Sequence, residues 1–190
     1  MGEQHSNHQS IHFHQNKDTE IERVLGIVWD PERDVFCFSA TPPTKVQAML
    51  QSLERPSKRV VLSCVMAMFD PLGLLGPFTI MGRMLVQDLW RTGCEWNDPI
   101  DDESFEKLIK WTTMLTEVAK IQIPRSYFGD AESNQMENLQ LHIFTDASET
   151  AYGCVAYFRV EVNGEVRCAL VMSRSKVAPL KMLTIPRLEL

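Results

Sequence analysis

The chain has 190 residues, of which 44% are hydrophobic and 23% charged, a composition typical of globular proteins. This length accommodates one ordinary domain or two small ones. The formal net charge of -6 argues against a stand-alone nucleic-acid-binding protein, whose binding surface is usually basic, although local patches matter more than the total.

Neither a secretory signal nor a membrane span is predicted. Met1–Glu22 is polar and His-rich, and the longest apolar run, Val60–Phe69, is shorter than the roughly 20 residues that cross a bilayer. The five cysteines are far apart and form no C-x-x-C pair, so we expect buried, reduced thiols. These features predict an intracellular protein, cytoplasmic or nuclear, without membrane contact.

The first predicted elements are a polar tail and a hairpin. His5, His8, His12 and His14 lie in the tail, where a solvated segment is favoured over a metal site because no apolar frame fixes the ligands. Val24–Asp30 and Val35–Ser39 are β-type runs around the turn Pro31–Asp34, which predicts a hairpin.

Helical patterns follow between Thr41 and Arg125. The first helix is expected to bury one face, and Ser57 to cap a second, largely buried helix that runs from Lys58 to about Phe69. The expected buried positions of the first helix are Val46, Met49, Leu50 and Leu53. Asp70–Pro77 holds two prolines, two glycines and three leucines, which predicts an irregular segment that is packed.

Two more helices are expected before the sequence pattern changes from helical to β. The third runs from about Phe78 to Arg91 with Gly93 as C-cap. The fourth is capped by Asp98, Asp101 or Asp102 and closes at Ile123-Pro124-Arg125. Its predicted inner face holds Phe105, Leu108, Ile109, Thr112, Leu115 and Val118.

After the polar linker 129–138, the pattern becomes β. Strands are expected at Leu139–Asp146, Ala151–Val160 and Val166–Met172, with Asn163-Gly164 as the turn between the last two. The middle strand is apolar on both faces and so expected to be central. Ser173–Pro186 is expected to be a connection, and Arg187 to begin a helical turn.

Three strands and one helical turn leave one sheet face without a helix to cover it, and the sequence looks cut rather than finished. The predicted class is α+β, with helices followed by a mixed sheet. The predicted parts are a flexible tail at 1–22, a β-hairpin at 23–40, a helical region at 41–128, the linker at 129–138 and a small incomplete domain at 139–190.

Two acidic residues carry the chemistry. Asp146 ends an apolar strand, and Glu189 stands in the helical turn after the third strand, so the two carboxylates can meet at the sheet. Taken separately, Asp146 is explained as a turn aspartate and Glu189 as a glutamate in the first turn of a helix. Together they suit Mg²⁺ or Mn²⁺, and two such ions about 3.5–4 Å apart hydrolyse phosphodiesters.

Several segments resemble the Pol polyprotein of Bel–Pao retrotransposons. Ile143–Ser148, Ala151–Tyr157 and Ser173–Leu180 resemble the opening of its ribonuclease H domain, as does Thr184–Leu190. Phe69–Pro77 resembles the family's most recognisable segment. Further upstream, Val24–Asp30 resembles the last palm strand of reverse transcriptase, and Trp96, Trp111 and Ile123-Pro124-Arg125 also fall where the family has them.

The resemblance implies a fold, a reaction and partners. Residues 23–128 would be the end of a reverse transcriptase with its thumb and connection, and residues 139–190 the first three strands and first helical turn of a ribonuclease H. The implied substrate is RNA in an RNA–DNA hybrid or template–primer duplex, and the remainder of the polyprotein is the implied partner. Asp146 and Glu189 match metal-binding carboxylates, expected to bind Mg²⁺ or Mn²⁺ weakly in this chain.

Four further residues are candidates for contact with nucleic acid. Ser148 is also explained by turn capping, and Gly153 by close packing. Lys58 and Arg59 are also explained as solvated helix charges.

Departures from the family pattern limit the expected activity. The aspartate pair of the polymerase and the later nuclease carboxylates are not found, so the chain alone is expected to be inactive or nearly so. The family is also grouped with Pao-type peptidases, yet Asp146-Ala-Ser and Asp70-Pro-Leu-Gly differ from an aspartic-peptidase loop. Two alternatives are a non-catalytic nucleic-acid-binding or interaction module, and a relic without function.

Overall fold

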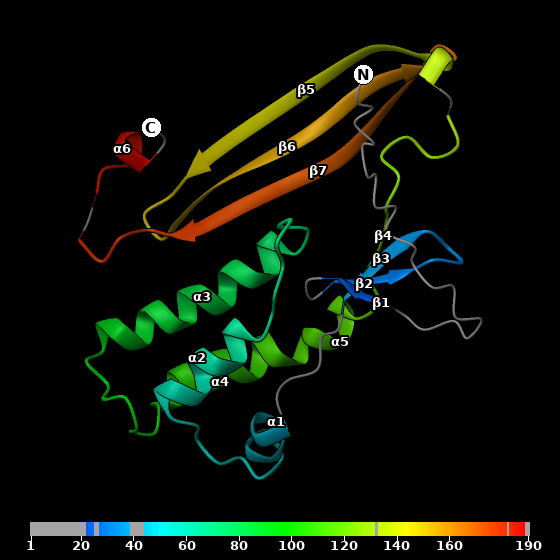
Figure 1. The fold of residues 1–190 in the computed structure, drawn as a ribbon. Coiled ribbons are helices and arrows are strands. Elements are labelled where there is room, and N and C mark those ends of the chain that lie inside the picture. The colour runs from blue at the N-terminus through cyan, green and yellow to red at the C-terminus, as the bar shows by residue number, and fades with distance from the viewer. Residues whose placement is uncertain (1–21, 25–26, 39–43, 132, 182, 189–190) are drawn as a thin grey trace, which may run out of the picture.

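The computed structural model describes residues 22–24, 27–38, 44–131, 133–181 and 183–188. Two antiparallel sheets lie at different sides of a group of helices (Figure 1). This arrangement confirms the predicted α+β class. The polar tail and Glu189 lie outside the described residues.

The first sheet contains β1 (Glu22–Val24), β2 (Ile27–Asp30), β3 (Val35–Phe38) and β4 (Gln122–Pro124), in that order. The predicted hairpin is confirmed, since Asp30 pairs with Val35. Two predictions are wrong. The run from Val24 to Asp30 is divided between β1 and β2, which pair with each other. Ile123-Pro124 forms an edge strand against β3 instead of simply ending a helix.

The helices are α1 (Thr44–Gln51), α2 (Lys58–Met66), α3 (Gly76–Arg91), α4 (Asp102–Thr113) and the short α5 (Leu115–Val118). Most of the predicted inner face of the fourth helix is buried, with Leu108 fully so, although the predicted single helix is divided into α4 and α5. Trp111, which was not predicted to lie on this face, is also buried and stacks on Phe78 at a centroid distance of 5.0 Å. Leu53 was expected to be buried but is 70% exposed. It lies beyond the end of α1 with φ of 53°, so the helical periodicity no longer applies to it.

The segment Asp70–Pro77 is packed, as predicted, but it is irregular only up to Leu75, because α3 begins at Gly76 and not at Phe78. Both carboxylate oxygens of Asp70 accept backbone N–H groups, from Leu74 at 2.9 Å and from Leu75 at 2.7 Å. Leu75 is buried, and Leu72 and Leu74 pack against the same core as β2 and β3. The aspartate therefore closes a compact turn whose leucines face inward.

The second sheet is an antiparallel meander of β5 (Met136–Ala147), β6 (Ala151–Val162) and β7 (Glu165–Val177), preceded by the 3-10 turn Ser133–Gln135 and followed by α6 (Ile185–Leu188). The central position of β6 is confirmed. Asn163 and Gly164 adopt φ of 52° and 82°, as the predicted tight turn requires.

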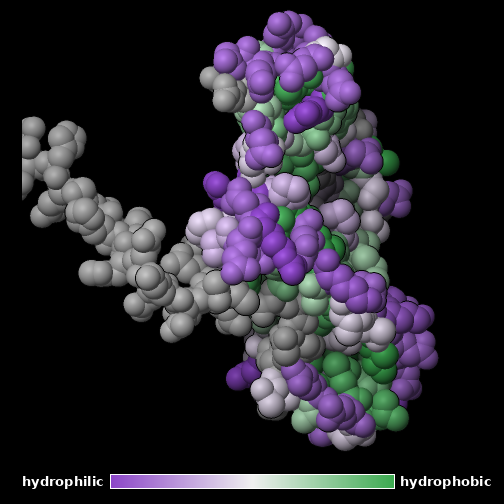
Figure 2. Space-filling view, turned by 90° about the vertical axis from the view of Figure 1, so that its right-hand side faces the viewer, coloured by the Kyte–Doolittle hydropathy of each residue, from purple (hydrophilic) through white to green (hydrophobic). Residues whose placement is uncertain are grey.

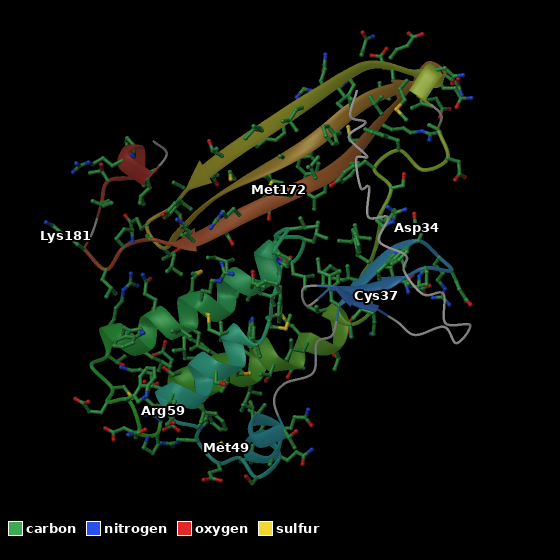
Figure 3. The ribbon with its side chains drawn as sticks, in the orientation of Figure 1. Asp34, Cys37, Met49, Arg59, Met172 and Lys181 are labelled. Carbon is green, nitrogen blue, oxygen red and sulfur yellow. The ribbon has the colours of Figure 1, made fainter. Side chains whose placement is uncertain are left out.

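One prediction about β7 is wrong, because the strand continues through Ser173–Val177 instead of ending at Met172. This extension pairs with Ala151–Val155 of β6. It also contacts the helical region, since Ser173 N–H donates to Leu72 O at 2.9 Å and Arg83 Nη1 donates to Ser175 O at 3.0 Å. The edge of the sheet is thereby joined to α3 and to the Asp70–Pro77 segment (Figures 1 and 3).

Large apolar side chains remain exposed on the second sheet, as predicted. Leu141 is 55% exposed and Ile143 63% exposed on one face of β5, and Met172 of β7 is 42% exposed. Tyr127 and Phe128 contact Phe158 and cover the far end of that face, where Val160 and Val162 are buried. Figure 2 shows a mainly hydrophilic surface at the top of the molecule and a hydrophobic patch at the height of the helices.

The cysteines differ from the prediction of buried thiols. Cys64 of α2 is buried, and this burial raises the pKa of its thiol to about 11. Cys37 and Cys94 are partly buried, whereas Cys154 and Cys168 are exposed because they lie on strands that no helix covers there. No helix within the described ranges is long and apolar enough to cross a membrane.

Candidate functional site

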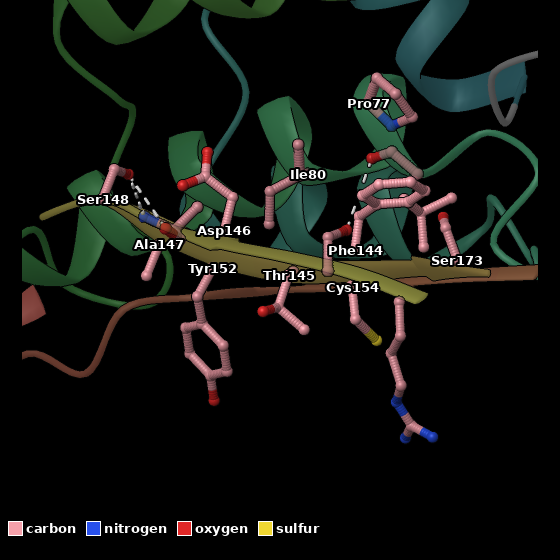
Figure 4. Close-up of a pocket in the computed structure, with 16 residues that line it drawn as sticks. Pro77, Ile80, Phe144, Thr145, Asp146, Ala147, Ser148, Tyr152, Cys154 and Ser173 are labelled. Carbon is pink, nitrogen blue, oxygen red and sulfur yellow. Dashed lines mark hydrogen bonds between the residues drawn. The ribbon is translucent and has the colours of Figure 1, made fainter. Parts of the chain in front are cut away.

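Asp146 lies at the C-terminal end of β5, directly opposite Gly153 of β6. Since successive side chains of a strand point to opposite faces, Asp146 shares a face with Phe144, and Thr145 points the other way. Figure 4 shows the Asp146 carboxylate on the side of the sheet where Pro77 and Ile80 of α3 lie. Thr145, Tyr152 and Cys154 point away from α3.

A cavity of about 350 Å³ opens between this end of the sheet and the start of α3. Gly76, Pro77 and Ile80 line it from the helix, and Phe144 and Asp146 line it from β5. Asp146 is exposed, so its carboxylate oxygens remain accessible to a cation or to a water molecule. A rigid strand end thus presents one hard oxygen ligand beside a cavity.

The turn after Asp146 is closed by Ser148. Its Oγ donates to Ala151 O at 3.0 Å and accepts the N–H groups of Ala151 at 3.2 Å and Thr150 at 3.3 Å. The backbone of Ser148 also donates to Ala151 O at 2.8 Å. These hydrogen bonds support a turn-capping role for Ser148, and the turn holds the end of β5 in place.

Gly153 also has a packing role. A Cβ atom at this position would lie 3.0 Å from Arg174 O on β7. The glycine therefore allows β7 to lie close to β6 at the position that pairs with Asp146. Contact between Gly153 and nucleic acid stays a prediction.

The second predicted carboxylate, Glu189, lies outside the described residues, one position after the end of α6. Leu188 of α6 lines a second cavity, of about 230 Å³, which Thr145 and Asp146 also line. The end of α6 is therefore next to the end of β5. Within the described ranges, no group of three or more His, Cys, Asp or Glu side chains is placed to hold a metal ion. The described residues supply one carboxylate and do not complete a metal site by themselves.

The two cations predicted at the start of the second helix are not equally accessible. Lys58 is only 4% exposed, and its Nζ lies 4.2 Å from the centroid of the Trp90 ring. Arg59 is exposed, and its guanidinium carbon lies 5.5 Å from the Trp96 ring. Both cations are held by aromatic rings far from Asp146, so the structure does not bring the two sets of predicted residues together.

Arg174 and Lys176 also line the second cavity, with Tyr152. They lie in the stretch that was predicted to be a connection, and residues of a loop are not expected to point to one face of a sheet. The alternation of Ser173, Arg174, Ser175 and Lys176, with a cation at every second position, is the pattern that would have indicated it.

The model of the Pao retrotransposon-like RNaseH-like domain matches residues 57–190. The matched range includes α2 to α5 as well as the second sheet. No curated protein matches the chain.

Proposed function

Because the chain belongs to the family of Pao retrotransposon-like RNaseH-like domains, we propose that it is the part of a retrotransposon polyprotein that links reverse transcriptase to ribonuclease H. The ribonuclease H would hydrolyse RNA in RNA–DNA hybrids. The observation that carries the proposal is the exposed carboxylate of Asp146 at the end of β5, beside a cavity. The hairpin of β2 and β3 would form the end of the palm, the helices the thumb and connection, and the second sheet the start of the nuclease.

In this proposal Asp146 and Glu189 are metal ligands. Asp146 and Leu188, which directly precedes Glu189, line one cavity, so the end of α6 lies at the same end of the sheet as Asp146. Bound Mg²⁺ or Mn²⁺ would supply an activated water and stabilise the leaving oxygen of a phosphodiester. The chain's own contribution is to hold one carboxylate rigidly, through the Ser148 turn and the close contact of β6 with β7.

The isolated chain is expected to bind the metal weakly and to show little or no nuclease activity. Two carboxylates are fewer ligands than a pair of divalent ions needs, and the described residues bring no third acid to Asp146. The proposed partners are the RNA–DNA hybrid or template–primer duplex and the remainder of the polyprotein.

A manganese titration of the full chain tests the metal site. Mn²⁺ binding, followed through the relaxation of water protons, should be weak and should weaken by about tenfold or more in Asp146→Asn and in Glu189→Gln. Asp130→Asn is the matched control, because Asp130 is an exposed acid in the linker, away from both cavities. Unchanged Mn²⁺ binding in both site variants would refute the assignment of the ligands.

The same proteins should be incubated with a labelled RNA–DNA hybrid and Mg²⁺. We expect no efficient cleavage by the wild-type chain. Rapid cleavage that Asp146→Asn abolishes would show that the chain already contains a complete nuclease centre. Hybrid binding that persists in Asp146→Asn and Glu189→Gln, without any Mn²⁺ site, would favour the non-catalytic module instead.

A further inference from the structure

A basic segment lies within this acidic chain. Val166–Leu188 contains Arg167, Arg174, Lys176, Lys181 and Arg187 but no aspartate or glutamate, whereas the chain has a net charge of -6. Local concentration of positive charge is the electrostatic signature of a surface that contacts nucleic acid, whatever the total charge of the protein.

Arg167 donates to Phe128 O at 3.3 Å, but the cations further along this segment differ from most others in the described ranges because they form no ion pair or cation–π contact there. Arg55, Arg91, Lys107, Lys120 and Arg125 pair with carboxylates, and Lys58 and Arg59 contact tryptophan rings. Arg174 and Lys176 are exposed, and neither forms an ion pair or a cation–π contact with a described residue. Their charges are available to an external anion.

Strand geometry places these two cations on one face. Arg174 pairs across the sheet with Cys154, and Lys176 with Tyr152, so both point in the direction that Tyr152 and Thr145 take in Figure 4. Two residues of strand separate their Cα atoms by about 6.6–6.8 Å. Asp146 also contributes to the lining of the cavity of about 230 Å³ that they line with Tyr152. Lys181 projects from the segment that leads to α6 (Figure 3).

We propose that Arg174 and Lys176, with Tyr152 between β5 and β7, form a binding site for the phosphate backbone of a nucleic acid that passes the end of the second sheet. Two cations on one strand face can each contact a phosphate, and the half-buried Tyr152 ring offers a surface for a sugar or a base. The site lies at the same end of the sheet as Asp146 but on the opposite face, because the Asp146 carboxylate points towards α3 whereas Tyr152 and Cys154 point away from it. This inference rests on the proposed function and adds a contact with the nucleic acid on the face of the sheet that α3 does not cover.

Binding of a fluorescent RNA–DNA hybrid to the full chain, measured by anisotropy at several salt concentrations, tests this site. Arg174→Ala/Lys176→Ala should lower the affinity by roughly tenfold or more. It should also reduce the slope of log K against log salt by about 2. Arg33→Ala/Lys110→Ala removes equal charge from exposed positions on the β2–β3 turn and on α4, and should change neither quantity as much. Arg174→Lys/Lys176→Arg should retain binding.

The outcomes separate this inference from the proposed function. Equal losses in the two alanine variants would overturn the site, because binding would then follow total charge. Unchanged affinity in Arg174→Ala/Lys176→Ala, with Mn²⁺ still bound through Asp146, would overturn the site and leave the proposed function standing. Absence of hybrid binding by a wild-type chain that retains its native circular dichroism spectrum would contradict both.

Discussion

Gly73 and Ser173 are in such close contact that a Cβ atom built on Gly73 would lie 1.9 Å from Ser173 O. Gly73 also has φ of 69°, a conformation that L side chains rarely adopt, and its carbonyl accepts the Ser173 hydroxyl. The glycine is therefore required twice, for its backbone angle and for the approach of β7 to the Asp70–Pro77 segment.

Gly73→Ala should consequently destabilise the protein strongly. We expect a loss of about 2–4 kcal/mol in the free energy of unfolding, because backbone strain adds to a clash with a backbone atom. Urea denaturation followed by tryptophan fluorescence measures the loss. Gly93→Ala is the matched control, since Gly93 has φ of 71° but open space around the missing Cβ. It should lose only about 1 kcal/mol. Equal losses in the two variants would show that the contact with Ser173 contributes nothing.

Asp101 should matter to α4 far more than its neighbour Asp98. Its side chain accepts the N–H of Ser104 at 2.8 Å, which satisfies a free donor in the first turn. Asp101→Ala should lower the free energy of unfolding by about 0.5–2 kcal/mol. Asp98→Ala removes an equal charge from an exposed connection and should cost less. Chemical denaturation of both variants would decide this, and identical values would contradict the capping role.

The pH dependence of stability should reveal the link between Asp34 and Arg125. Arg125 donates to both carboxylate oxygens of Asp34, at 2.6 and 3.1 Å, and this hydrogen bonding holds the pKa of Asp34 below its usual value. The stabilising contribution is therefore present above the ordinary Asp pKa of about 3.9 and is lost as the pH falls through the lower, folded-state pKa.

Asp34→Asn isolates this effect, because asparagine tolerates the φ of 50° at this position. The difference in unfolding free energy between wild type and Asp34→Asn should shrink as the pH falls from 7 towards 2.5. A difference that stays constant over this range would exclude the ion pair as its source. Asp130→Asn, at an exposed linker position, should show no such trend.

The cysteines should separate by reactivity. At pH 8 the exposed thiols Cys154 and Cys168 should react with an aromatic disulfide reagent in the native protein, whereas Cys64 should react only on unfolding. Native Cys154→Ser/Cys168→Ser should accordingly lose most of the rapid phase. Because the folded-state pKa of Cys64 is about 11 and that of an unfolded cysteine about 8.5, this group lowers stability as the pH rises above 8.5. A fast reaction of Cys64 would contradict its burial.

Local signals in the sequence predicted the elements that depend on local contacts. Pro31–Asp34 and Asn163-Gly164 are turns whose residue types determine the backbone, and the inner face of α4 follows from its period. β4 was missed because a three-residue strand containing proline has almost no pattern, and it exists only through pairing with β3. Ser173–Val177 was missed because serine-rich residues favour loops, whereas here Ala151–Val155 and Leu72 supply its hydrogen bonds.

The candidate site likewise has some features that neighbouring residues determine and others that depend on tertiary contacts. The position of Asp146 at a strand end and the capping of its turn by Ser148 follow from neighbouring residues. That the carboxylate faces α3 depends on how the sheet packs on the helical region, through residues about one hundred positions apart such as Gly73 and Ser173. No local pattern contains this information. The shared face of Arg174 and Lys176 likewise depends on the tertiary extension of β7.

The hydrogen bonds between β7 and the Asp70–Pro77 segment have a consequence for processing of a polyprotein. A protease that cuts the exposed stretch at Gly129 and Asp130 would sever the only covalent link between the helical region and the second sheet, yet Ser173, Ser175 and Ala178 would still be bound to Gly73, Arg83 and Gln87. The two products should therefore co-elute in gel filtration after cleavage, and Gly73→Ala should let them separate. In such a protein, maturation by cleavage would not by itself dissociate the second sheet from the helical region that precedes it.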